Sequence, residues 1–243
     1  MQLASRLLFA LVAAILALPV QGTRAADTYR VLSPPGGSSA SAVLLVPGCS
    51  GFAGVSSSLY QERATELQAA GYWVVFVDYL QRRNLTNCAG GRDVSHAEVG
   101  KDILDAAAWA ATLPSVASGN VFVIAWSYGG GGVLAALASI ESGRAPIARA
   151  AMYYPDCRRS KPWSSTAVSV LMLLGASDEV ALPFLCDAVI KGAPPNTLRT
   201  VVYPGARHAF DVPTLPERAE FGRIGFNAEA AQAAWRAVLE FLR

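Results

Sequence analysis

The chain has 243 residues, of which 53% are hydrophobic, and it carries 20 basic against 18 acidic side chains. A formal charge of +2 argues against nucleic acid as a partner, and the apolar content is sufficient for one large core. The sequence contains no internal repeat or heptad pattern, so nothing in it requires a second folded domain.

The first 25 residues have the pattern of a signal peptide. Arg6 precedes an unbroken apolar run, Leu7–Leu18, and a short polar stretch of small residues follows. We predict cleavage after Ala25, with Gly22 as the alternative. The run is shorter than the roughly 20 residues that span a bilayer, so no stable membrane anchor is expected. A buried N-terminal helix is the competing interpretation, but the run has no polar face.

Cleavage would leave residues 26–243 as a single domain, secreted or periplasmic. Its charge would be zero, because removing Arg6 and Arg24 takes the basic count from 20 to 18. Four cysteines in an exported chain indicate an oxidising compartment, and they allow three pairings. The sequence does not determine the oligomeric state.

Apolar runs and helical patterns alternate along this domain. The runs typical of buried strands are Ala42–Val46, Trp73–Val77, Val121–Ala125, Ala148–Tyr153, Val168–Leu174 and Arg199–Tyr203. The segments with helical spacing are Ser57–Ala70, Glu98–Thr112, Tyr128–Glu141, Leu182–Lys191 and Asn227–Leu242. This order predicts an α/β fold with a mostly parallel central sheet and helices on both faces. Functional groups in such folds gather at the carboxyl ends of the strands.

A candidate nucleophile follows the third of these runs. Ser127 lies in Ala-Trp-Ser-Tyr-Gly-Gly-Gly-Gly, between an apolar strand and a helical pattern. A nucleophile elbow needs small residues two positions before and after the serine, because the chain bends sharply there. Ala125 and Gly129 meet that demand, although glycine is usual at the first position. A glycine-rich turn without catalytic role would not explain a serine at this point.

A serine nucleophile needs a base, and the chain has only two histidines. His208 follows the last predicted strand, where a loop can bring the imidazole over the elbow. His96 precedes a helical pattern in a polar stretch, which favours a surface or capping residue. We therefore predict His208 as the base.

The orienting acid should follow a strand between serine and histidine in the chain. Asp178 and Glu179 both qualify, and Asp178 is preferred because its shorter side chain lies nearer the strand end. Asp156, after an earlier strand, is the reserve candidate. Asp211 lies only three residues beyond the histidine and is interpreted as a loop-stabilising carboxylate.

The loop after the first predicted strand is a candidate for the oxyanion hole. It reads Pro47-Gly48-Cys49-Ser50-Gly51, and a glycine turn can aim backbone N–H groups at a developing oxyanion. The N–H groups of Cys49 and Tyr128 would form the hole. Cys49 lacks the strand-elbow-helix setting of a nucleophile.

The sequence from about Tyr29 to its end resembles the dienelactone hydrolase family. The resemblance rests on the Ser127 elbow, on Gly175-Ala176-Ser177-Asp178 and on Tyr203-Pro204-Gly205-Ala206-Arg207-His208-Ala209-Phe210-Asp211. Two departures are that archetypal members carry a cysteine where this chain has Ser127, and that relatives often have His-Gly at Pro47-Gly48. The resemblance implies an α/β-hydrolase fold without a large cap domain, acting on small-molecule esters or lactones.

Other functions compete with this one. The elbow is also similar to prolyl-oligopeptidase-type peptidases, whose propeller domain 218 residues cannot supply, and to secreted polyester-degrading hydrolases. A secreted binding protein could keep the fold without catalysis. Two histidines in unrelated contexts offer no metal ligand set, and no cofactor is expected.

Position along the predicted sheet selects one disulfide pairing. Cys49 and Cys88 follow the first two strands, and Cys157 and Cys186 follow consecutive strands beyond the elbow. Bridged Cα atoms must lie within roughly 7 Å, which disfavours a bridge across the elbow. We predict Cys49–Cys88 and Cys157–Cys186, with four buried free thiols as the alternative.

Overall fold

The computed structural model describes residues 29–89, 91–117, 119–140, 145–216 and 223–243. The predicted signal peptide, residues 1–25, lies outside this part of the chain. Within the described residues, no helix is both long and apolar enough to cross a membrane.

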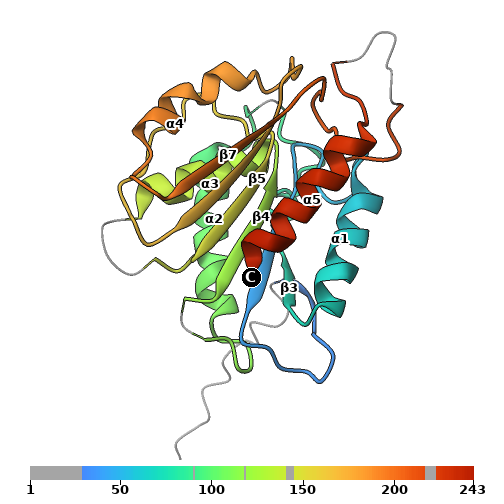
Figure 1. Ribbon diagram of the computed structural model, residues 1–243. Helices are drawn as coiled ribbons and strands as arrows, with labels where there is room; N and C mark the ends of the chain where they lie inside the picture. Colours follow the sequence, from blue (N-terminus) through green and yellow to red (C-terminus); the bar gives the residue numbers. More distant parts are fainter. Residues whose placement is uncertain (1–28, 90, 118, 141–144, 217–222) are drawn as a thin grey trace, which may run out of the picture.

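A seven-stranded sheet forms the centre of the molecule (Figure 1). Its strands are β1 Arg30–Leu32, β2 Ala42–Val46, β3 Trp73–Phe76, β4 Val121–Trp126, β5 Arg149–Tyr153, β6 Ser169–Gly175 and β7 Leu198–Tyr203. They are ordered β1-β3-β2-β4-β5-β6-β7, and every pairing is parallel except that of β1 with β3. The mostly parallel sheet is therefore confirmed.

Helices cover both faces of the sheet, as predicted (Figure 1). They are α1 Ser57–Ala69, α2 His96–Ala110, α3 Tyr128–Ser139, α4 Asp187–Gly192 and α5 Ala228–Leu242, with 3-10 turns η2 Gln81–Arg83 and η3 Pro183–Cys186. Alternating residues of each strand point to opposite cores. Val123 packs with α2 and α3, whereas Ile124 packs with α1 and α5.

Glycines allow α2 and α3 to pack closely. A Cβ on Gly132 would lie 2.3 Å from Cγ1 of Val99, and one on Gly100 would lie 2.8 Å from the backbone nitrogen of Ala136. The start of α2 is fixed by a capping box in which Ser95 and Glu98 exchange hydrogen bonds. Small residues on both helices, including the glycine run after the elbow, therefore bring α2 close against α3.

Two elements differ from the sequence prediction. β1 was not predicted, because three residues are too few to show a periodicity. The helix expected at Leu182–Lys191 is instead η3 followed by the short α4, with Pro183 at the first position of η3. No cap domain is inserted among the described strands and helices, in agreement with the predicted fold.

Candidate active site

Ser127 lies in a sharp turn between β4 and α3. Its backbone has φ 49° and ψ −115°, a conformation that L residues rarely adopt outside strained functional turns. The Ser127 N–H donates to the carbonyl oxygen of Tyr153 over 2.9 Å, which ties the turn to the end of β5. This is the local geometry of a nucleophile elbow.

The elbow depends on a glycine two residues after the serine. A Cβ on Gly129 would lie 2.5 Å from the carbonyl oxygen of Pro47 and 2.8 Å from that of Val46, so no larger residue fits without movement. On the other side, a Cβ on Gly48 would lie 3.4 Å from Cβ of Ser127. The loop after β2 therefore packs directly against the serine.

His208 connects Ser127 to Asp178. The Nε2 atom of His208 lies 2.9 Å from Oγ of Ser127, and its Nδ1 lies 2.8 Å from Oδ2 of Asp178. His208 and Asp178 are both buried. The three side chains come from loops after β4, β6 and β7, at one edge of the sheet, as parallel strands dictate.

Asp178 is held in place by its own turn. Its Oδ1 accepts the N–H groups of Val180 and Ala181, each over 2.8 Å, which leaves Oδ2 for the imidazole. The neighbouring acid, Glu179, is exposed. Of the two acids in this turn that the sequence offered, only Asp178 contacts His208.

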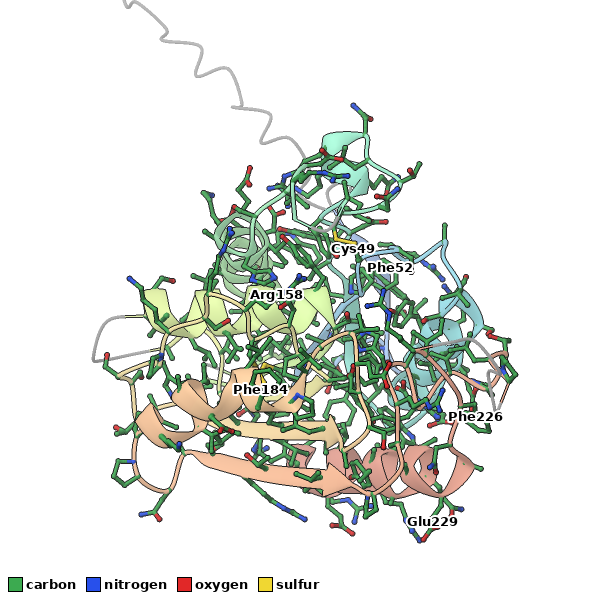
Figure 2. The ribbon with its side chains drawn as sticks, turned by 90° about the horizontal axis from the view of Figure 1, so that it is seen from above. Cys49, Phe52, Arg158, Phe184, Phe226 and Glu229 are labelled. Atoms are coloured by element: carbon green, nitrogen blue, oxygen red, sulfur yellow. A yellow bond between two sulfur atoms is a disulfide. The ribbon has the colours of Figure 1, made fainter. Side chains whose placement is uncertain are left out.

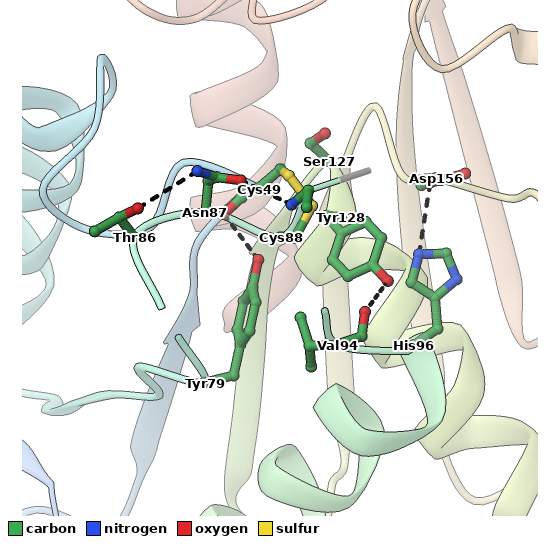
Figure 3. Close-up of a disulfide and its surroundings, with 12 residues drawn as sticks. Cys49, Tyr79, Thr86, Asn87, Cys88, Val94, His96, Ser127, Tyr128 and Asp156 are labelled. Atoms are coloured by element: carbon green, nitrogen blue, oxygen red, sulfur yellow. Dashed lines mark hydrogen bonds and ion pairs between the residues drawn. A yellow bond between two sulfur atoms is a disulfide. The ribbon is translucent and has the colours of Figure 1, made fainter. Parts of the chain in front are cut away.

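Two buried tyrosines, Tyr60 and Tyr79, anchor the loop that carries Cys49, and Figure 3 shows Tyr79 near Cys49. The N–H of Gly48 donates to the hydroxyl of Tyr60 over 3.0 Å, and the hydroxyl of Tyr79 donates to the carbonyl of Gly48 over 2.8 Å. Burial raises the pKa of both tyrosines, so both hydroxyls stay protonated. These residues cannot be identified from the sequence, because tyrosines at apolar positions look like ordinary core residues.

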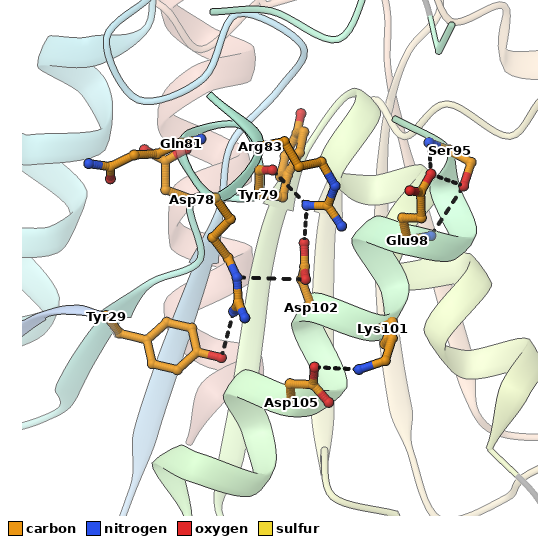
Figure 4. A network of polar contacts seen from close by, with 11 residues as sticks. Tyr29, Asp78, Tyr79, Gln81, Arg83, Ser95, Glu98, Lys101, Asp102 and Asp105 are labelled. Carbon is orange, nitrogen blue, oxygen red and sulfur yellow. Dashed lines mark hydrogen bonds and ion pairs between the residues drawn. The ribbon is translucent and has the colours of Figure 1, made fainter. Parts of the chain in front are cut away.

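The segment after β3 that carries Tyr79 is joined to α2 by polar contacts (Figure 4). Arg83 donates from one Nη atom to the carbonyl of Tyr79 over 2.7 Å and to Oδ2 of Asp102 over 2.5 Å. Asp102 is a buried residue of α2. A chain of polar contacts thus runs from α2 through Arg83 and Tyr79 to the loop that holds Cys49.

The structure joins Cys49 to Cys88 and Cys157 to Cys186, the two pairs expected from the sequence. Their Cα atoms are 4.9 and 5.1 Å apart. Figure 2, seen from above, shows the first bridge beside the Cys49 label. The N–H of Cys88 also donates to the carbonyl of Cys49 over 2.9 Å.

His96 is not the cap of α2, and its side chain is partly exposed, in agreement with a non-catalytic residue near the surface but not with a capping role. Ser95 is the cap of α2, and the His96 ring is mostly buried, with its centroid 4.3 Å from that of Tyr128 (Figure 3). Its Nε2 lies 3.5 Å from Oδ2 of Asp156, which also accepts from Arg158 over 2.7 Å. The polar sequence around His96 gave no sign of this burial, because its partners lie in other loops.

Asp156, the reserve acid, is used elsewhere. Its carboxylate is held by Arg158 and faces His96, whereas His208 is bound by Asp178. Burial alone would raise the pKa of Asp156, but the contacts with His96 and Arg158 outweigh burial and lower it. Asp156 is therefore held as an anion between His96 and Arg158.

A cavity of about 790 Å³ opens next to the Cys49 loop. It begins at Ser50 and runs between the segment before α1 and the segment after β3, with Phe52, Leu80 and Leu85 as apolar lining. The Cys49–Cys88 bridge joins these two segments. The cavity therefore lies beside the predicted oxyanion loop.

Comparisons with known proteins place the chain in one family. The family model of the dienelactone hydrolase family matches residues 29–243. A search of curated proteins found no match.

Solved structures with the same fold include three that are informative. A putative dienelactone hydrolase from Klebsiella pneumoniae is 19% identical over 84% of this chain and 87% of its own, with a TM-score of 0.62. A dienelactone hydrolase-like promiscuous phosphotriesterase from metagenomic libraries is 18% identical, covering 83% and 85%, with a TM-score of 0.63. A propionate-bound esterase from Thermogutta terrifontis is 15% identical, covering 88% of both chains, with a TM-score of 0.56.

At these identities the structural matches show the fold, whereas the family model covers nearly the whole described chain. The resemblance inferred from the three sequence segments is confirmed. The chain belongs to the dienelactone hydrolase family, within the α/β-hydrolase fold.

Proposed function

We propose that the protein is a serine hydrolase that cleaves carboxylic esters or lactones through an acyl-enzyme, with Ser127, His208 and Asp178 as its catalytic triad. One observation carries the proposal. Oγ of Ser127 lies 2.9 Å from a histidine whose other nitrogen is bound to a buried aspartate. Nucleophile, base and orienting acid are thus within hydrogen-bond reach of one another.

The reaction follows from these contacts. Nε2 of His208 takes the proton of Ser127 as Oγ attacks the carbonyl carbon, and Asp178 stabilises the resulting imidazolium. The N–H groups of Cys49 and Tyr128 stabilise the oxyanion. His208 then gives its proton to the leaving alkoxide, and water attacks the acyl-enzyme with His208 as base again, which releases the acid and restores Ser127.

Membership of the dienelactone hydrolase family favours an ester or lactone of modest size. The 790 Å³ cavity beside the oxyanion loop has both apolar and polar lining, and no cap domain encloses it among the described residues. Its lining does not include Ser127, His208 or Asp178, so the cavity borders the site and could hold only a part of the substrate that extends beyond the reacting carbonyl. A prolyl-oligopeptidase-type peptidase would need a gating propeller domain, and the described residues form none. A polyester chain is the competing substrate class.

Two of the structural neighbours suggest a covalent probe for Ser127. One neighbour is a promiscuous phosphotriesterase, and the Thermogutta terrifontis esterase has been solved phosphorylated by paraoxon. We therefore expect an organophosphate to phosphorylate Ser127, since a tetrahedral phosphorus mimics the charge that develops during acyl transfer.

The deciding experiment combines labelling with hydrolysis. The protein is treated with a fluorophosphonate, digested and mapped by mass spectrometry, beside the Ser127→Ala variant. p-Nitrophenyl esters of graded acyl length, simple lactones and a polyester film are assayed in parallel. Labelling at Ser127 with ester or lactone turnover supports the proposal. An unlabelled protein without turnover would indicate a binding protein instead.

We also propose export, with removal of residues 1–25. Two disulfides in the described chain are compatible with an oxidising compartment. N-terminal sequencing of the protein recovered outside the cytoplasm should begin at Ala26. A protein that retains Met1 and stays inside the cell would contradict export.

A further inference from the structure

One buried carboxylate is not used by the proposed triad. Asp211 lies three residues beyond His208 and is only 3% exposed. Burial raises its pKa, and hydrogen bonds from Tyr154 and Trp126 oppose that rise. Burying a carboxylate costs free energy unless its oxygens are hydrogen-bonded to nearby donors.

Asp211 accepts a hydrogen bond at each oxygen. Nε1 of Trp126 donates to Oδ2 over 2.8 Å, and the hydroxyl of Tyr154 donates to Oδ1 over 2.5 Å. Trp126 is the last residue of β4 and directly precedes Ser127, whereas Tyr154 directly follows β5. One side chain in the histidine loop is thus joined to two strand ends, including the one that carries the nucleophile.

The hydrogen bond between Trp126 and Asp211 is the first link, and the Trp126 ring also contacts residues that lead to the oxyanion loop. The Trp126 ring stacks on Tyr153 at a centroid distance of 5.4 Å and meets the edge of Tyr60 at 5.0 Å. Tyr60 in turn holds the N–H of Gly48. The hydrogen bond that Trp126 donates to Asp211 therefore fixes a ring that supports both the strand before Ser127 and the loop with Cys49.

The second link acts on the base. The Tyr154 ring packs against the imidazole of His208 with centroids 4.6 Å apart. Its backbone is in the left-handed region, at φ 37°, and its N–H donates to Leu173 over 2.7 Å. With its hydroxyl held by Asp211, the ring cannot slide along the imidazole.

We propose that Asp211 is a positioning residue, which through Trp126 and Tyr154 keeps Ser127 and His208 in register for proton transfer. The inference rests on the proposed function. Asp211 exchanges no proton and contacts no substrate in this scheme. Its contribution is to the geometry of groups that react, where a misplacement of about 1 Å can cost roughly 100-fold in rate.

The test compares three substitutions, with kcat counted per site titrated by a fluorophosphonate. Asp211→Leu removes both acceptors at similar size, and we expect kcat to fall roughly 10- to 100-fold with KM within about threefold. Asp211→Asn keeps a carbonyl oxygen that accepts from Trp126, and its amide NH2 can donate to the hydroxyl oxygen of Tyr154. It should recover kcat to within about fivefold of wild type.

Tyr154→Phe cuts only the second link, keeps the ring on His208, and is the fallback if Asp211→Leu does not fold. Its kcat should fall about 3- to 10-fold. Asp105→Leu, at an exposed aspartate of α2 paired with Lys101, is the matched control and should keep wild-type kcat.

The outcomes separate the two claims. If wild type neither reacts with the fluorophosphonate nor hydrolyses esters, the proposed function fails, whatever the variants do. If wild type is active but Asp211→Leu or Tyr154→Phe keeps wild-type kcat per titrated site and only unfolds at a lower temperature, Asp211 is merely structural. A kcat for Asp211→Asn as low as that of Asp211→Leu would also overturn positioning by hydrogen bonds.

Discussion

The backbone N–H of Asp156 donates to the carbonyl oxygen of Ser127 over 3.0 Å. The backbone of this residue, and not its carboxylate, supports Ser127, the proposed nucleophile. The carboxylate turns away to Nε of Arg158, 2.9 Å from Oδ1. Asp156 thus stabilises the elbow from outside the proposed triad, and Asp178 is the acid that contacts His208.

Substitutions in the proposed triad should abolish ester hydrolysis without unfolding the protein. Ser127→Ala and His208→Ala should each lower kcat by about 10⁴-fold or more, and Asp178→Asn by about 10⁴-fold, because a misoriented imidazole cannot accept the serine proton. Glu179→Gln, at the exposed neighbouring acid, is the matched control and should be near wild type. Steady-state kinetics with circular dichroism tests this. An active Asp178→Asn beside an inactive Glu179→Gln would reverse the assignment.

The Asp156 cluster should make stability depend on acid pH. Despite burial, contacts with His96 and Arg158 lower the pKa of Asp156 in the folded state. A lowered pKa stabilises the fold fully above the unfolded value of about 3.9, and this stabilisation is lost as pH falls from there through the folded pKa. Urea unfolding should therefore show wild type more stable than Asp156→Asn at pH 7, with a smaller difference at pH 3. A difference independent of pH would contradict the ionised cluster.

The sequence could predict the parts of the site that are local. Ser127 can be proposed as the nucleophile because an apolar strand, the serine and a glycine-rich helix follow one another directly in the chain. His208 can be proposed as the base because it follows the last strand. Residues that are distant in the sequence and come into contact only in the folded protein leave no contiguous motif of this kind. Tyr60 and Tyr79 approach Gly48 from different elements, and their hydroxyls cannot be distinguished from core positions in the sequence.

The glycine after the elbow offers a steric prediction. A Cβ at position 129 would lie 2.5 Å from the carbonyl oxygen of Pro47, which is backbone and cannot rotate away. Gly129→Ala should therefore displace α3 from the oxyanion loop, lower kcat roughly 100-fold and destabilise the fold by about 1 to 3 kcal/mol. Ala138→Ser, at an exposed position of the same helix, is the control. Kinetics and thermal unfolding measure both effects, and a fully active Gly129→Ala would refute this close contact.

The two disulfides should be equally important for stability and unequally important for activity. They close loops with sequence separations of 39 and 29, so each should add about 4 kcal/mol by restricting the unfolded chain. Only the first carries a proposed oxyanion donor. Cys49→Ala/Cys88→Ala should therefore lower kcat as well as stability, because the Cys49 loop loses its covalent link to the segment after β3.

Cys157→Ala/Cys186→Ala is the matched variant for this comparison. Its bridge joins the loop after β5 to η3, and neither cysteine is assigned to the reaction. We expect it to lose comparable stability but to keep kcat within about threefold of wild type, measured well below its unfolding temperature, because Asp178 is held by the N–H groups of its own turn. Chemical denaturation measures the free energy of unfolding of each variant, and kinetics with p-nitrophenyl esters measure its kcat. Equal kcat in the two double variants would show that the first bridge does not fix the oxyanion loop.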